Sequence, residues 1–159
     1  MEFIKKQTVG VWMAFCTLLL GIISFIVYKA NIAGVGYFHG ASVETASRYM
    51  IIAIVLEICV LVLAQLHMDG IVAKLLNFIT DIARIVIPAL AVAAVLAIVS
   101  ARVEGFAFIY FSNAEVLQEI QTPANISSAH GAIANIVFLA ITAVVGIIGA
   151  FFSTRKANG

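Results

Sequence analysis

Glu57 is the residue with the clearest potential for chemistry, because it is a carboxyl group inside an apolar stretch from about Tyr49 to Leu66. Insertion scales assign a charged group near the bilayer centre a cost of about 2.5–3.5 kcal/mol, so we expect it to face other helices or a wet cavity. Thr17 and Thr142, in two other apolar stretches, are its candidate partners. Two interpretations are open: an ion or proton site, or a protonated carboxyl group hydrogen-bonded between helices.

Asp81 and Arg84 form a second candidate group at the start of the third apolar stretch. Their spacing of three places them on one face of a helix, where they can pair. A gate or a lipid-headgroup site is one interpretation. We favour an ion pair at the membrane interface, in which the long Arg84 side chain extends toward water.

A third set of polar residues lies in or beside the predicted outer loops: His39, Glu44, Arg102, Glu104 and His130. Imidazole and carboxylate groups can bind zinc or copper, and three of them could form an enzyme site if they converged. The spacing matches no metal motif, and nucleophile-elbow, P-loop and dinucleotide-binding motifs are absent from the sequence. We therefore predict no catalytic residues, no metal and no cofactor. Haem is disfavoured because His67 is expected on the opposite membrane side.

The composition requires lipid as the solvent for these residues. The chain has 159 residues, of which 64% are hydrophobic and 11% charged, and its mean hydropathy is +1.14. Soluble domains are about 45–50% apolar and about 25% charged. Nine Lys and Arg against eight Asp and Glu give a net charge of +1, which excludes a strong electrostatic signal for nucleic acid.

Four apolar stretches are close to the roughly 20 residues that a membrane-crossing helix needs. The predicted spans are about 9–28, 47–66, 82–101 and 129–152. Rows of small residues on the third and fourth spans predict close contacts between helices. These rows are Ala89, Ala93, Ala97 and Ala101, and Thr142, Gly146 and Ala150. The two cysteines, Cys16 and Cys59, are expected to be buried thiols.

The distribution of basic residues predicts the orientation. With both termini on one side, that side holds six of the nine Lys and Arg residues and the other side holds three. The positive-inside rule then places both termini in the cytoplasm. We expect a multi-pass protein of the cell membrane.

Residues 102–128 are predicted to form a structured outer cap. Within it, Ser112-Asn113-Ala114-Glu115 is typical of a capping box that opens a short helix lying flat on the membrane surface. The run RVEGFAFIYFSN at 102–113, followed by QTPANISS at 121–128, resembles a signature of small four-span membrane proteins from Gram-positive bacteria, which have no assigned function. The resemblance implies a four-span architecture and no particular substrate.

The sequence therefore predicts an all-α integral membrane four-helix bundle with both ends inside and a structured outer loop. Three functions are open. We favour a non-enzymatic accessory or interaction subunit, or a homo-oligomer, because small-residue faces suit helix packing. The alternatives are a small ion or solute transporter that uses Glu57, and a membrane enzyme with an outward-facing polar site. The expected partners are the lipid bilayer and a second copy or a larger membrane protein.

Overall fold

The computed structural model describes residues 7–66 and 70–154, and within them the chain is helical with no strand. The helices are α2 (Val9–Ala33), α3 (Glu44–Gln65), α4 (Gly70–Phe111), α5 (Ala114–Ile120) and α6 (Pro123–Ala150). All except α5 are long and apolar enough to cross a membrane. The predicted all-α fold with four spans is confirmed.

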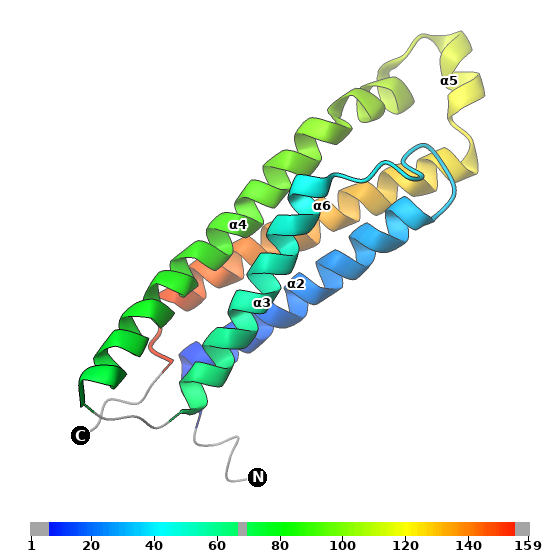
Figure 1. Cartoon of the computed structure of the whole chain (residues 1–159). Coiled ribbons are helices and arrows are strands. Elements are labelled where there is room, and N and C mark those ends of the chain that lie inside the picture. Colours follow the sequence, from blue (N-terminus) through cyan, green and yellow to red (C-terminus); the bar gives the residue numbers. More distant parts are fainter. Residues whose placement is uncertain (1–6, 67–69, 155–159) are drawn as a thin grey trace.

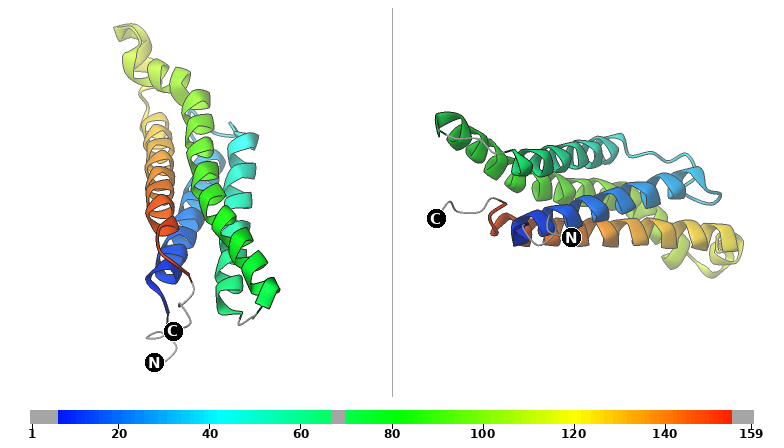
Figure 2. Two further views of the ribbon diagram at one scale, coloured as in Figure 1. Left: turned by 90° about the vertical axis from the view of Figure 1, so that its left-hand side faces the viewer. Right: turned by 90° about the horizontal axis from the view of Figure 1, so that it is seen from below.

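The four long helices run alternately up and down (Figure 1). Helix α6 packs against α2 and α4, and α3 packs against α4 and α2. The start of α2 and the end of α6 lie at one end of the bundle, called here the termini end. The short helix α5 lies at the opposite end, called here the cap end, as Figure 2 also shows.

The helices are longer than the predicted spans. Helix α2 continues to Ala33, and α4 has 42 residues, which at about 1.5 Å per residue gives a length of about 63 Å. Residues 112–122 are the part of the predicted cap that lies outside α4 and α6. No proline interrupts 102–111, so α4 continues to Phe111, and Pro123 occupies the first turn of α6, where a missing N–H costs nothing.

Polar side chains cap several helix starts. The side chain of Asn113 accepts a hydrogen bond from the Val116 N–H at 3.0 Å and caps α5. The predicted capping box had placed Ser112 in this role, and that detail is wrong by one residue. The placement of α5 flat on a membrane surface stays a prediction.

The core divides into a central cluster and a smaller cluster at the cap end. The central cluster includes Tyr28, Ala94 and Leu139, and the second surrounds Phe38 and Ile109. Small residues let the helices approach where the core is tightest. A Cβ atom on Gly146 of α6 would lie 3.2 Å from Pro88 Cβ and 3.4 Å from Thr17 Cγ2.

Two predictions about buried residues, for the cysteines and for the alanine row on α4, do not fully match the structure. The prediction that Cys16 and Cys59 are buried is wrong, since both thiols are free and exposed on the outside of the bundle. In lipid, a small weakly polar side chain faces outward at little cost, so burial was not required. Only part of the alanine row on α4 lies in contacts between helices, because Ala89 and Ala101 are exposed.

Candidate functional site

Glu57 lies near the middle of α3 and points into the bundle. It stands 13 residues after Glu44 and 8 before Gln65, or about 20 Å and about 12 Å along the helix. Its side chain is 5% exposed. The helix therefore carries a carboxyl group into the apolar interior, somewhat nearer the termini end than the cap end.

The carboxyl group borders a small cavity on the bundle axis, called here the central cavity. Its volume is about 20 Å³, enough for about one water molecule. All four long helices line it, and its polar lining residues are Thr17 of α2, Glu57 of α3 and Thr142 of α6. The three residues singled out in the sequence thus lie around one cavity.

Neither threonine offers its proton to Glu57. The Thr17 hydroxyl donates to the Met13 carbonyl at 2.9 Å, and the Thr142 hydroxyl donates to the Phe138 carbonyl at 2.8 Å. A hydroxyl group has one proton, so each oxygen has only acceptor capacity left for the cavity. Across residues 7–66 and 70–154, the hydrogen-bond pattern gives the Glu57 carboxyl group no side-chain donor.

A second cavity leads from Glu57 toward the termini end. It has a volume of about 10 Å³, and Glu57 and Arg84 both line it, together with Pro88 and the small residues Gly146 and Gly149. The cavity therefore has a basic and an acidic side chain on its walls. Glu57 therefore stands between two cavities, and Arg84 closes the second.

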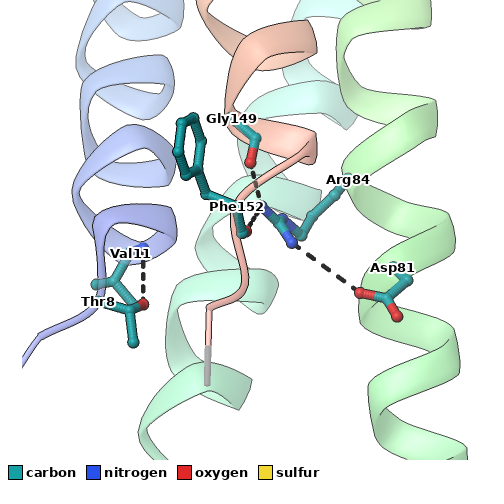
Figure 3. Close-up of polar contacts among 6 residues, drawn as sticks. All are labelled: Thr8, Val11, Asp81, Arg84, Gly149 and Phe152. Atoms are coloured by element: carbon teal, nitrogen blue, oxygen red, sulfur yellow. Dashed lines mark hydrogen bonds and ion pairs between the residues drawn. The ribbon is translucent and has the colours of Figure 1, made fainter. Parts of the chain in front are cut away.

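Arg84 is held by the end of α6. Its Nη2 donates hydrogen bonds to the carbonyl oxygens of Gly149 and Phe152, and its side chain is 8% exposed (Figure 3). Asp81, which is 71% exposed, lies 4.0 Å away from Nη1. The expectation that Arg84 extends toward water is wrong, because the last carbonyls of a helix lack intrahelical donors and a guanidinium group can supply them. The ion pair is present but secondary.

The cap end is closed by the loop between α2 and α3. Arg102, 2% exposed, donates to the Ala41 carbonyl at 2.6 Å, and its guanidinium carbon lies 4.3 Å from the centre of the Phe38 ring. Gly105 leaves space for that ring, since a Cβ there would clash with it. On the other side, the Phe38 N–H donates to the Ser128 hydroxyl at 3.1 Å.

Below this closure, Ser24 and Asn135 form a buried polar contact between α2 and α6. Asn135 Nδ2 donates to the Ser24 carbonyl at 2.8 Å and to its hydroxyl at 3.0 Å. The two residues are 0% and 1% exposed. The sequence analysis missed this pair, although an asparagine inside a 24-residue apolar stretch was the signal for it. Tyr28, Ile98 and Leu139 belong to the buried apolar cluster of the core, so among the described residues the polar groups form no continuous path from the cap end to Glu57.

The remaining outer residues do not come together. His39, Glu104 and His130 are exposed, and His39 Nδ1 is bonded to the Gly34 carbonyl at 2.8 Å. Glu44 pairs with Arg48 of its own helix at 2.5 Å. In the part of the chain that the structure describes, no group of three His, Cys, Asp or Glu side chains could hold a metal ion. His67 lies outside the described residues. Of the five outer candidates, Arg102 is the one that the fold turns inward.

Comparisons with protein-family models, with curated proteins and with solved structures find no match to this chain. The resemblance to the Gram-positive four-span proteins stays a prediction. The geometry around Glu57 is accordingly the basis for assigning a function to this multi-pass, membrane-type helical bundle.

Proposed function

We propose that this small integral membrane protein binds and transfers protons at Glu57, and exchanges them from the termini end. The observation that carries the proposal is a buried carboxyl group with a cavity on each side and no side-chain donor among the described residues. Buried polar groups are normally hydrogen-bonded. Ionisable residues inside membrane spans are rare and mark ion pathways and proton relays.

The size and chemistry of the central cavity favour a proton over a metal cation. Calcium takes about 6–8 oxygen ligands and magnesium requires octahedral coordination. Around this cavity, one carboxyl and two hydroxyl groups are available in a space of about 20 Å³. A proton needs a single carboxylate oxygen, and a water molecule in the cavity could carry it to or from Glu57.

Arg84 places a positive charge beside the site. Its guanidinium group lines the second cavity together with Glu57, and a positive charge there stabilises the carboxylate that remains when the proton leaves. The cap end is closed by packed side chains, whereas the second cavity leads from Glu57 toward the end of α6. A proton therefore has a shorter path to Glu57 from the termini end than from the cap end. The proposal includes transfer across the whole bundle, which requires the packed cap half to open during transport.

Reconstitution into liposomes tests the proposal. Purified protein is placed in vesicles that contain a pH-sensitive dye, and a potassium diffusion potential drives protons inward. We expect acidification with the wild-type protein and its loss with Glu57→Gln. Glu119→Gln, a matched carboxyl change on the exposed α5, should behave like the wild type. Equal acidification by wild type and Glu57→Gln, or none above empty vesicles in either, contradicts the proposal.

An accessory or interaction subunit is the second candidate, and the exposed part of the alanine row on α4 favours it. Ala89 and Ala101 are small exposed residues at two levels of α4, and membrane helices approach one another closely at small residues. Mass measurement of the detergent-solubilised protein tests this candidate. It requires a homo-oligomer or a stable co-purifying membrane protein that is lost with the double change Ala89→Leu, Ala101→Leu. Neither candidate makes the protein an enzyme.

A further inference from the structure

A long groove runs along the outside of the bundle between α2 and α3, in the half nearer the termini end. Its volume is about 470 Å³, far larger than either cavity at Glu57. Seven apolar side chains line its length, and two glutamines complete it. The apolar residues are Val11, Trp12, Phe15, Leu18, Ile58, Leu61 and Val62.

The polarity of the groove is confined to one end. Gln7 precedes α2 and Gln65 ends α3, and their amides bond each other reciprocally at 3.3 and 3.2 Å. Trp12, whose ring meets Phe15 edge-on with 6.3 Å between the ring centres, lies five residues after Gln7. Tryptophan favours the level where a bilayer meets water. The groove thus has an amide pair at that level and an apolar trough leading toward the bilayer interior.

We propose that this groove binds one acyl chain of a membrane phospholipid, with the ester region of the lipid at Gln7 and Gln65. The apolar trough matches a hydrocarbon chain, and the amide N–H groups match ester carbonyl oxygens. Gln65 is exposed, Gln7 is half-buried and the hydrogen bonds between them lie at the surface, so a lipid can replace these bonds without opening the core. This binding does not depend on the proposed proton transfer at Glu57.

The dimensions of the groove favour a chain over a partner helix. A helix about 10–12 Å wide that rises about 1.5 Å per residue fills roughly 120–170 Å³ per residue. The groove of about 470 Å³ would therefore be filled by about three or four helical residues, or roughly one turn. A helix from a second copy would therefore place only about one turn of side chains in the groove. An extended acyl chain is thin enough to lie along it.

Trp12 provides a direct test, because it is the single tryptophan of the chain. The protein in detergent micelles is titrated with phosphatidylcholine whose acyl chains carry bromine, which quenches tryptophan fluorescence on contact. We expect quenching that saturates at a low lipid fraction and is reversed by unbrominated phosphatidylcholine. The Glu57→Gln variant should give the same curve, which separates this proposal from the proposed function.

A variant in which larger side chains fill the groove provides the control. The double change Ile58→Phe, Val62→Phe should shift the lipid fraction for half-quenching at least tenfold upward. The matched change Ile141→Phe, Val144→Phe, on the exposed face of α6, should leave it in place. Quenching that rises linearly with lipid fraction in all variants means bulk contact and overturns the proposal. A dimer that the groove-filling change dissociates, with no saturable quenching, means that a second copy covers the groove and also overturns it.

Discussion

Replacing Arg84 by methionine tests how the structure positions the charge next to Glu57. The change keeps much of the apolar stem but removes the donors to the carbonyl oxygens of Gly149 and Phe152. Hydrogen bonds to charged groups contribute about 1.5–3 kcal/mol each, so the two bonds are worth about 3–6 kcal/mol. Removing a buried cation recovers several kcal/mol of its desolvation cost, which offsets part of this loss. We expect a net destabilisation of about 2 kcal/mol.

The matched control is Asp81→Asn, which removes the other polar partner of Arg84. The Asp81 side chain is 71% exposed and 4.0 Å from Nη1. Exposed ion pairs contribute about 0–1 kcal/mol, so this variant should differ little from the wild type. Arg84→Lys should be intermediate, because one ammonium group keeps the charge but cannot reach two carbonyl groups with the geometry of a guanidinium fork.

The assay is thermal unfolding in detergent, followed by the fluorescence of Trp12, which lies on α2 near the termini end. We expect the melting temperature to fall in the order wild type, Asp81→Asn, Arg84→Lys and Arg84→Met. If Asp81→Asn is as damaging as Arg84→Met, the ion pair is the main contact of Arg84. The account of a guanidinium group held by the end of α6 would then be refuted.

Two further predictions concern the packing of α6. Asn135→Leu should destabilise the protein by about 1 kcal/mol in the same melting assay. Interhelical polar contacts in membranes average about 0.6 kcal/mol and reach about 1.7 kcal/mol. An increase in stability would show that the contact between Asn135 and Ser24 is not favourable. Gly146→Leu should lower the yield of folded monomer on size-exclusion chromatography, whereas Gly146→Ala should be milder, since a Cβ atom there lies 3.2 Å from Pro88 and 3.4 Å from Thr17 and a longer side chain has no room. Equal yields for the two variants would contradict the tight contact between α4 and α6.

The polar residues inside apolar stretches were the part of the site that sequence could predict. Glu57, Thr17 and Thr142 each interrupt a different span, and the fold brings them to one cavity. In lipid, the core and the outer surface of a bundle are both apolar. The turn-by-turn contrast that marks the buried face of a soluble helix is therefore weak, and polar and small residues are what identify the inner face.

Most of the wrong predictions have the same cause, which is that both the core and the outer surface of a bundle in lipid are apolar. Cys16 and Cys59 were assigned to the interior because free cysteine is usually buried, but that tendency belongs to proteins in water, and in lipid a small weakly polar side chain faces outward at little cost. The partners of Arg84 are backbone carbonyl groups 65 and 68 residues away. Every residue has such a group, so the residue types cannot indicate which ones accept a hydrogen bond. His39, Glu104 and His130 were grouped by loop, whereas helical phase turns Glu104 and His130 outward and His39 is exposed in the loop between α2 and α3.

The protonation of Glu57 itself is the most direct test of the central claim. Infrared difference spectra of the protein in lipid, recorded while the pH is cycled, report the C=O stretch of protonated carboxyl groups. We predict a reversible band that is present in the wild type and in Glu119→Gln and missing in Glu57→Gln. An identical pH-dependent band in Glu57→Gln, or a Glu57 band that does not respond to pH, would show that this carboxyl group does not exchange protons and would contradict the account.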